Sequence, residues 1–317
     1  MKRPAGHAPT RIHVCIPTYR RPEGLRRALQ SVAGQRVGEE GVRVAVWVVD
    51  NDAAGPAGAV CDALRDGYPW PLHHVVAPER GISHARNRAL EAALPGCDYL
   101  AFLDDDEIAP PDWLRDLLAA RRRHRADVIA APVHRALPDS APGWVREARV
   151  FQGERHAEGQ RLHRAATGNT LIRAGVLRRS GLRFDPRLAL SGGEDTLFFR
   201  QLARQGARIH WTNSGAVTET VPAARLSRRW VWRRGYCLGN SVTRVHLIDR
   251  PLPAAIRFVP AYLAREGLRA LALLGARLRG RRRHVWIDLI YCGAIQLGIV
   301  SAVLGGRPRH YERTQEE

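Results

Sequence analysis

The stretch that decides the fold is Tyr99-Leu100-Ala101-Phe102-Leu103-Asp104-Asp105-Asp106, in which five apolar residues run directly into three aspartates. The apolar part is typical of a strand buried on both faces, as in a parallel sheet. Three adjacent carboxylates repel one another unless water or a cation lies nearby, so we expect them where this strand ends, at an edge of the sheet. Oxygen ligands suit Mg²⁺ or Mn²⁺ shared with substrate phosphates. An acidic turn that caps the helix beginning near residues 110–114 is the alternative interpretation.

The sequence before this stretch alternates between strand and helix patterns. Two segments are β-branched and apolar on both faces, at 11–17 and 42–49, and two have apolar residues at helical spacing, at 22–33 and 84–94. Strand, helix, strand, helix, strand predicts a parallel sheet wound by right-handed crossovers. Ligands bind beyond the carboxyl ends of the strands in such sheets. We therefore expect one crevice to gather three polar clusters, at 17–20, 50–52 and 104–106.

No glycine-rich phosphate loop marks this crevice. The first strand is not followed by G-x-G-x-x-G, and the chain contains no G-x-x-x-x-G-K-[ST], so a dinucleotide-binding fold and a P-loop ATPase are both disfavoured. A metal on the aspartates could hold phosphate instead, with help from arginines such as Arg80, Arg86 or Arg88.

Five motifs, in matching order and spacing over roughly the first 220 residues, resemble the inverting glycosyltransferases of family 2, which have the GT-A fold. The motifs are VCIPTYRR at 14–21, VVDN at 48–51, GISHARNRAL at 81–90, FLDDD at 102–106 and GGED at 192–195. The resemblance implies an α/β fold with a Rossmann-like, mostly parallel sheet and helices on both faces. It also implies a GT-A catalytic domain at 10–222, followed by a basic helical region at 223–317.

The resemblance further implies the residues that bind the nucleotide sugar and the metal. Pro17 and Tyr19 would line the nucleotide pocket, Asp50 would accept a hydrogen bond from the base, and Arg86 would lie against the nucleotide. The metal-binding element would be the aspartate cluster. In it Asp106 is the direct ligand of Mg²⁺ or Mn²⁺, and Asp104 or Asp105 contacts the ribose or the waters of the ion. Asp104 is also a candidate metal ligand.

The second half of the sequence contains a candidate for the catalytic general base. Gly192 and Gly193 precede Glu194 and Asp195, which begin an amphipathic helix that stops at Gly206. Either carboxylate could serve only as a helix cap. The resemblance places the general base on Asp195, with Glu194 as the next candidate. Sugar transfer passes through an oxocarbenium-like state, so a carboxylate that takes the proton of the attacking hydroxyl belongs opposite the cation that stabilises the diphosphate.

These features predict transfer of a sugar from a UDP, GDP or dTDP sugar to a hydroxyl acceptor, in cell-surface polysaccharide or glycolipid assembly. One alternative is a sugar nucleotidyltransferase, but its glycine-rich first loop with arginine and lysine is missing, and the only lysine is Lys2. A second alternative is a non-enzymatic basic adaptor for membrane or nucleic acid. Release of nucleoside diphosphate, release of diphosphate or no turnover would separate the three.

Composition indicates a reduced, cytoplasmic setting. The 317 residues are 45% apolar, which is ample for one large or two modest domains. Five scattered cysteines form no C-x-x-C pair, so we expect neither disulfides nor structural zinc. Residues 1–10 contain no long apolar run and do not look like a signal peptide.

The positive charge is concentrated near the C-terminus. Of a net +19, residues 223–317 contribute +12, from 18 arginines and 6 acidic residues. Nucleic acid is a poor explanation, because no nucleic-acid motif occurs and the arginines alternate with long apolar segments. Anionic phospholipid explains both features, so we expect the enzyme at the inner face of the cell membrane, as a peripheral protein.

Two segments indicate how the enzyme would bind the membrane. On a helical wheel five leucines share one face opposite a charged face; the leucines are 263, 268, 271, 274 and 278, and the charged residues are Arg265, Glu266, Arg269 and Arg277. The segment 285–304 is long enough to span a bilayer, but Asp288 and Gln296 interrupt it, so we expect shallow insertion, with a true span as the runner-up. A helical pair packed on the catalytic domain is a third interpretation.

The acceptor side is predicted from the segment 228–236, where Trp230, Trp232 and Tyr236 are interleaved with arginines. Aromatic faces stack on sugar rings or lipid, and arginines pair with phosphates, so a lipid-linked acceptor would fit. A packing helix is the alternative. Thr218-Glu219-Thr220 stands where many members of the family carry a histidine, so no third metal ligand is assigned.

Overall fold

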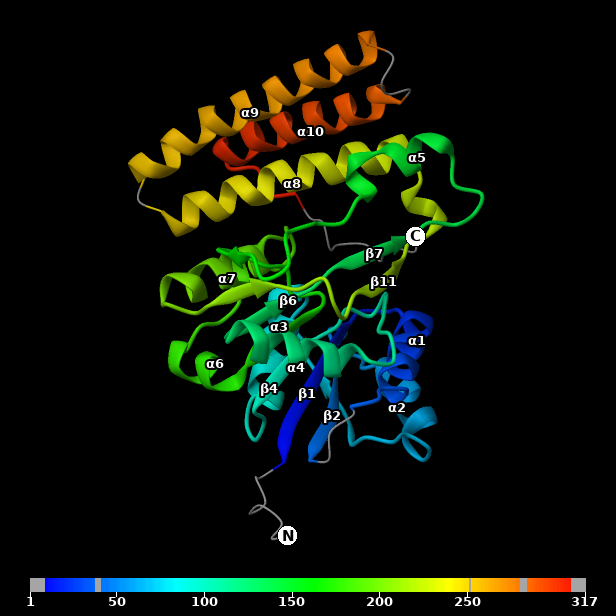
Figure 1. Cartoon of the computed structure of the whole chain (residues 1–317). Coiled ribbons are helices and arrows are strands. Elements are labelled where there is room, and N and C mark those ends of the chain that lie inside the picture. Colours follow the sequence, from blue (N-terminus) through cyan, green and yellow to red (C-terminus); the bar gives the residue numbers. More distant parts are fainter. Residues whose placement is uncertain (1–8, 38–40, 251, 280–283, 309–317) are drawn as a thin grey trace. The chain divides into compact units, whose positions relative to one another are not determined.

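The computed structural model describes residues 9–37, 41–250, 252–279 and 284–308 (Figure 1). Contacts between Cα atoms divide the chain into two compact units. Unit 1 comprises Met1–Val133, Glu154–Phe184 and Phe198–Glu219, and unit 2 comprises His134–Gly153, Asp185–Leu197 and Thr220–Glu317. The last change of unit, after Glu219, lies close to the predicted domain boundary at 222. Two earlier segments nevertheless belong to the same unit as the C-terminal helices.

Unit 1 is built on an eight-stranded sheet in the order β3-β2-β1-β4-β9-β6-β10-β8. The strands are β1 (Thr10–Thr18), β2 (Val42–Asp50), β3 (Leu72–Val76), β4 (Tyr99–Phe102), β6 (Val128–Ala130), β8 (Arg161–Leu162), β9 (Thr170–Arg173) and β10 (Ile209–Trp211). β2 and β4 flank β1 in parallel, β3 is parallel to β2, and β10 is parallel to β6. β9 is antiparallel to both β4 and β6, and β8 is antiparallel to β10. The sheet is therefore mainly parallel, as predicted, with two reversed strands that the sequence patterns did not reveal.

Helices cover both faces of this sheet, which confirms the predicted fold class. They are α1 (Pro22–Ala33), α2 (Ala57–Arg65), α3 (Ile82–Ala93), α4 (Trp113–His124), α6 (Ala174–Ser180) and α7 (Glu194–Arg204), the last of which crosses from unit 2 into unit 1 after Leu197. α1 begins with proline at its first turn and buries Leu25, Leu29 and Val32, the face expected from its spacing. α2 and β3 lie between the second and third predicted strands and were not predicted.

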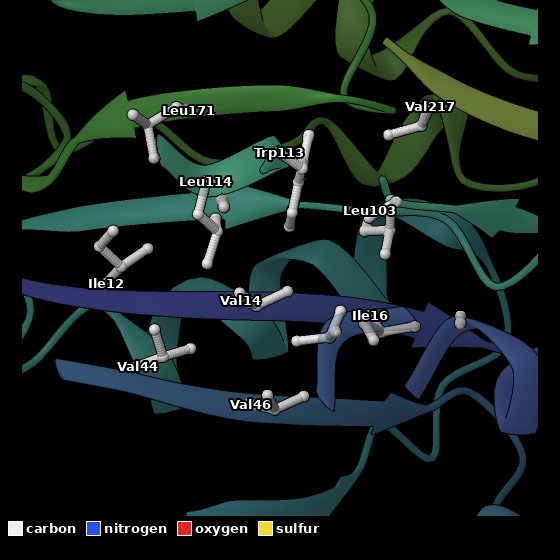
Figure 2. Close-up of a cluster of buried hydrophobic side chains, with 14 of the residues drawn as sticks. Ile12, Val14, Ile16, Val44, Val46, Leu103, Trp113, Leu114, Leu171 and Val217 are labelled. Atoms are coloured by element: carbon white, nitrogen blue, oxygen red, sulfur yellow. The ribbon is translucent and has the colours of Figure 1, made fainter. Parts of the chain in front are cut away.

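The core has two layers because side chains alternate along each strand. Figure 2 shows Ile12, Val14 and Ile16 of β1 in one buried cluster with Trp113 and Leu114 of α4. Cys15, on the opposite face of β1, belongs to the second cluster, together with apolar residues of α3. Both faces of β1 are thus buried, and only its carboxyl end is left to meet a ligand.

That end lies at a switch in the strand order. The chain runs from β1 outward to β2 and β3, and then returns to the other side of β1 to form β4. A ligand usually binds at such a switch point in open α/β sheets, beyond the carboxyl ends of the strands. A small second sheet begins nearby, where β5 (Glu107–Ile108) pairs antiparallel with β11 (Val217–Thr220).

Unit 2 is dominated by three long helices that run side by side in Figure 1: α8 (Arg228–Asp249), α9 (Leu252–Leu278) and α10 (Val285–Val303). Its shorter elements are β7 (Val133–Ala136), which begins in unit 1, α5 (Gly143–Glu147) and three 3-10 turns, at Arg149–Phe151, Pro186–Leu188 and Ala223–Arg225. α8 and α10 pack closely through glycine. A Cβ on Gly239 would collide with the backbone of Ile295, and one on Gly298 would collide with that of Tyr236.

α9 has an unexpected orientation. Glu266, on the charged face of the helical wheel, is fully buried, and its carboxylate lies 2.8 Å from Arg269, 3.1 Å from Arg265 and 3.6 Å from Arg149. Four of the leucines on the opposite face are exposed instead: 268, 271, 274 and 278. The polar face thus turns partly inward and the apolar face outward.

α10 is the one helix of the described residues that is long and apolar enough to cross a membrane. Just over half of its apolar stretch, 56%, is buried within the protein. A packed core helix would satisfy the same criteria, so length and composition do not make α10 a membrane span.

Candidate active site

Hydrogen bonds in unit 1 join the segment after β1 to the aspartates after β4. The Thr18 hydroxyl donates to Asp105 over 2.8 Å, and the Arg21 guanidinium donates to Asp105 over 2.9 Å and to Asp106 over 3.1 Å. Gly24, in the first turn of α1, packs against the backbone of Asp105. A Cβ at this position would lie only 2.7 Å from the Asp105 carbonyl oxygen. Two of the three predicted polar clusters therefore meet where the strand order switches, and the third joins them because the Asn51 N–H donates to the Thr18 carbonyl over 2.9 Å.

The three aspartates have different environments. Asp105 is buried, and burial raises its pKa to about 6 even though the Arg21 charge acts in the opposite direction. The side chains of Asp104 and Asp106 keep 35% and 24% of their surface exposed. Arg86, which is itself buried, lies 3.4 Å from Asp104. Asp104 and Asp106 are thus the carboxylates of this turn that lie within reach of a ligand from solvent, whereas Asp105 anchors the turn.

Glu107 was missed by the sequence reasoning, although it directly follows the cluster. Its carboxylate accepts the Asp104 backbone N–H over 2.9 Å, and its own N–H donates to the Asp104 carbonyl over 3.1 Å. Burial, followed by the Asp104 charge, raises the pKa of Glu107 well above its usual range. Gly168 is required beside it, because a Cβ there would lie 2.7 Å from a Glu107 carboxylate oxygen. These contacts fix the shape of the aspartate turn.

The turn after β2 places Asp50 inside the protein. Its carboxylate is fully buried and accepts backbone N–H groups from Asp52, over 3.1 Å, and from Ala57, over 2.7 Å. Asn51 is also held internally, since its amide donates to the carbonyls of Ala77 and Glu79. The hydrogen bond between Asp50 and the nucleobase of the donor stays a prediction. Asp52 is the other carboxylate of this turn that could accept that hydrogen bond.

Tyr19 lies in a cluster of charged side chains near the same turn. The guanidinium of Arg20 is 5.2 Å from the centre of the Tyr19 ring, and that of Arg80 is 4.9 Å from it. Arg20 also forms a salt bridge with Asp52, and this hydrogen bond lowers the pKa of Asp52. Pro17 is buried at the end of β1. An aromatic face flanked by cations suits a planar, electron-rich ring and its phosphates.

The described residues contain no group of three or more His, Cys, Asp or Glu side chains arranged around a metal site. Asp104 and Asp106 nevertheless fit a divalent cation of the kind that takes one or two carboxylates from the protein and its other oxygens from water and a diphosphate. Their exposure and hard oxygen atoms are the observations that support this fit.

The predicted base lies in unit 2, after two glycines with left-handed backbone. Gly192 has φ 81° and Gly193 has φ 92°, and a Cβ on Gly193 would lie 3.0 Å from a Val245 methyl group of α8. Glu194 is buried, whereas Asp195 is partly exposed and accepts the Thr196 N–H over 2.6 Å. Of the pair, Asp195 is the carboxylate that solvent reaches.

Arg244 of α8 holds the loop that leads to this pair, and no sequence motif pointed to this residue. Its guanidinium donates to the Ser191 hydroxyl over 2.6 Å and to the Arg187 carbonyl over 2.8 Å. The loop before Glu194 is therefore tied to α8 by polar contacts as well as by the fit of Gly193.

The three aromatic residues predicted on the acceptor side have different roles in α8. Trp230 stacks on Phe151, with 5.3 Å between the ring centres, and belongs to the packing of unit 2. Trp232 stacks on Tyr236 at 5.5 Å and is 45% exposed. The Tyr236 hydroxyl donates to Ser301 of α10 over 2.6 Å. Trp232 is therefore the aromatic side chain that can meet a ligand.

Comparison with known proteins identifies the family of this chain. The family described as glycosyl transferase family 2 matches residues 13–181. The succinoglycan biosynthesis protein ExoM of Rhizobium meliloti (strain 1021) is 36% identical over 240 residues, which cover 74% of each chain. The pre-mycofactocin glycosyltransferase of Mycobacterium tuberculosis (strain ATCC 25618 / H37Rv) is 28% identical over 80% of this chain and 52% of its own.

Solved structures show the same fold. The crystal structure of S. aureus TarS 1–349 matches with a TM-score of 0.53 and 16% identity, over 93% of this chain and 92% of that one. Its complex with UDP-GlcNAc matches with a TM-score of 0.51 and 15% identity, over 94% and 93% of the two chains. At this level of identity the likeness concerns the fold.

Proposed function

Because the chain belongs to glycosyl transferase family 2, it is a glycosyltransferase, as the sequence predicted, and we propose that it inverts the sugar it transfers from a nucleoside diphosphate to a hydroxyl. The meeting of Thr18, Arg21 and the aspartate turn at the switch point is the observation that carries this proposal. Membership of the family favours sugar transfer over the nucleotidyltransferase and adaptor alternatives.

On the donor side, the ring of Tyr19 would stack on the base of a UDP, GDP or dTDP sugar, with Pro17 shaping the pocket beneath it. Arg86 would lie against the diphosphate. Asp106 and Asp104 would hold Mg²⁺ or Mn²⁺, and such a cation neutralises the charge that develops on a departing diphosphate. Asp105 and Glu107 would keep this turn in shape, because both are buried and bonded within it. Two structures of S. aureus TarS contain UDP or UDP-GlcNAc, which supports a donor of this chemical class.

On the acceptor side, Asp195 would accept the proton of the attacking hydroxyl. The bond from that oxygen to the anomeric carbon would form as the bond to the diphosphate breaks, so a single displacement inverts the centre. Glu194 is buried and would orient the loop. The two left-handed glycines and Arg244 support this role, since they hold the first turn of α7 in one conformation.

The reaction would belong to the assembly of a cell-surface polysaccharide or glycolipid. The name of ExoM connects that relative with succinoglycan biosynthesis, and similarity over 74% of both chains supports a related role here. We further propose a lipid-linked hydroxyl acceptor beside Trp232 and Tyr236, and action at the cytoplasmic face of the membrane. The catalytic machinery would lie within residues 10–222, and residues 223–317 would serve the acceptor and the membrane.

The test of this mechanism is Asp195→Asn, which keeps the shape of the side chain and removes the proton acceptor. Transfer should fall by roughly 10²- to 10⁴-fold, the usual contribution of general base catalysis, while donor affinity changes little. Turnover is measured as nucleoside diphosphate released from a panel of nucleotide sugars, and donor affinity by calorimetry with Mn²⁺.

Glu194→Gln is the matched control, because the same loop carries it and its side chain is buried. Its effect on transfer should be smaller than that of Asp195→Asn. Near-normal transfer in the Asp195 variant, together with a severe loss in the Glu194 variant, would move the base to Glu194.

A further inference from the structure

The large apolar side chains that are exposed in the described part of the chain gather on and beside three helices. Among the described residues, every large apolar side chain that is exposed belongs to α8, α9 or α10 or directly follows α10; these residues are Trp232, Leu247, Leu268, Leu271, Leu274, Leu278, Leu297, Val300, Val303 and Leu304. Leu268 and Leu271 expose about two thirds of their surface, at 67% and 65%. A concentration of this kind marks an interaction surface, whereas single exposed apolar residues are ordinary.

α9 and α10 direct their apolar sides outward at the expense of polar ones. Glu266 of α9 is fully buried among arginines while Leu268 and Leu271 face out, and Asp288 of α10 is buried while Leu297 and Val300 face out. The buried Asp288 accepts the Arg149 backbone N–H over 2.9 Å. A helix pair that faces only water would be expected to have the reverse arrangement, with carboxylates outside and leucines inside.

A groove interrupts this surface. It has a volume of about 670 Å³, and its lining, apart from Gln296, is apolar: Trp232, Leu263, Ile290, Gly293, Ala294, Leu297 and Val300. Several of these residues also belong to the exposed set, so the groove opens within the apolar face. Its chemistry suits a hydrocarbon chain.

The charges on the same helices identify the partner. Residues 223–308 contain three carboxylates, and two of them, Glu266 and Asp288, are buried. Exposed arginines are plentiful by comparison: Arg228, Arg229 and Arg233 surround Trp232 in the sequence of α8, and Arg265 and Arg279 lie before and after the exposed leucines of α9. Helices that combine an exposed apolar face with a large excess of exposed arginines complement an anionic lipid bilayer. A second copy of this chain would bring arginine against arginine.

We propose that the outward face of α9 and α10, the docking face, seats in an anionic bilayer and that the groove takes the hydrocarbon chain of one anionic lipid. The proposal rests on the proposed function in one respect: docking would bring the enzyme to a lipid-linked acceptor. The protein docks on one leaflet, because the other side of α10 packs on α8 through Gly298 and Gly239.

The experiment measures flotation of the full chain with vesicles of phosphatidylcholine containing phosphatidylglycerol. The double variant Leu268→Ser/Leu271→Ser should lower the bound fraction about tenfold or more, since both leucines are exposed and their loss leaves the packed core intact. Arg229→Gln should weaken binding at low salt, and Arg43→Gln, an exposed arginine of β2, is the matched control that should not. Urea unfolding of each variant confirms that its stability is unchanged.

Occupation of the groove is read separately, with phosphatidylglycerol brominated on its acyl chains. Such vesicles should quench tryptophan fluorescence, and Trp232→Phe should remove a large part of that quenching. Equal flotation of the leucine variant and the parent, or quenching unaffected by Trp232→Phe, would overturn the proposal. So would retention in the membrane after alkaline carbonate, which indicates a spanning helix, or conversion from dimer to monomer by the leucine substitutions with unchanged flotation.

These readouts are independent of turnover. A chain that binds vesicles through the docking face but binds no nucleotide sugar would refute the proposed function and leave the docking face standing. A chain that transfers sugar to a soluble acceptor but ignores vesicles would do the opposite.

Discussion

Arg21 neutralises two carboxylates at once, and this explains how three adjacent aspartates can be tolerated. It bonds to Asp105 and Asp106 and is itself mostly buried, so part of the repulsion in the cluster is relieved without a metal. The sequence predicted the cluster and its position at a strand end. It could not predict that Arg21 and Glu107 hold the aspartates in place. The chain contains many arginines and carboxylates, and only the folded backbone shows which of them lie beside the cluster.

Asp106→Asn should abolish metal-dependent donor binding while leaving the fold intact. The side chain is partly exposed and keeps an oxygen that can accept from Arg21, so the loss would be one of charge toward the cation. Calorimetry with a nucleotide sugar, with Mn²⁺ and with a chelator, measures the effect. Asp62→Asn, at an exposed carboxylate of α2, is the control. Unchanged donor affinity with Mn²⁺ would contradict the assignment.

Asp105 should make the metal-free protein less stable as the pH rises. Its pKa of about 6 in the folded state lies above the ordinary value of 3.8, so the folded state holds the proton more tightly than the unfolded state does. The contribution is fully present below pH 3.8 and is lost as the pH rises through about 6. The free energy at stake is at most roughly 3 kcal/mol.

Urea unfolding in chelator at several pH values measures this effect. Asp105→Asn imitates the protonated side chain, so the stability of the variant relative to the parent should improve between pH 4 and pH 7, by roughly the amount that the linkage predicts. A difference between parent and variant that does not change over this range would show that the folded pKa of Asp105 is not raised.

At the scale of elements, the sequence predicted best those segments whose own residues decide their structure. The predicted helix at 22–33 coincides with α1, because proline and a spaced apolar face occur within it. β3 was missed because its five residues include two histidines and only one buried side chain, so pairing with β2 defines it more than its composition does. The reversed direction of β9 depends on its neighbours β4 and β6, which lie far away in sequence, so no local pattern predicts it.

Gly239→Ala should destabilise the packing of α8 on α10. The new methyl group would meet the backbone of Ile295, which cannot move aside as a side chain could, so the cost should reach or exceed the usual 1–3 kcal/mol, approximately, of an overpacked site. The urea midpoint and the near-ultraviolet circular dichroism of tryptophan measure it. Gly293→Ala is the control on α10, where no atom lies within 4 Å of the added carbon. It should be neutral or stabilising, since alanine favours a helix. Equal stabilities of the two variants would refute the role given to Gly239.

At the scale of the whole molecule, a chain that ends at residue 222 should not be a stable catalytic domain. Val145, Val150 and Phe151 form one core with Val231, Ile287 and Tyr291, all of which the shortened chain would lose or leave without partners. It should bind a hydrophobic dye and unfold without a sharp transition, as judged by dye fluorescence and urea titration. A chain shortened after Pro308 is the control and should behave like the parent. Cooperative unfolding of the fragment at the midpoint of the parent would support the boundary at 222.

The changes of unit along the chain, after residues 133, 153, 184, 197 and 219, have a further consequence for how such a protein can evolve. A gene gains or exchanges a domain most simply when that domain is one uninterrupted stretch of coding sequence. Unit 2 is not one uninterrupted stretch, because two of its three segments lie between segments of unit 1 in the sequence. A recombination event that replaced the C-terminal helices alone would leave the new helices beside loops inherited from another ancestor. Unit 2 should therefore change through point substitutions in both its embedded and its C-terminal segments rather than through exchange of the end of the chain.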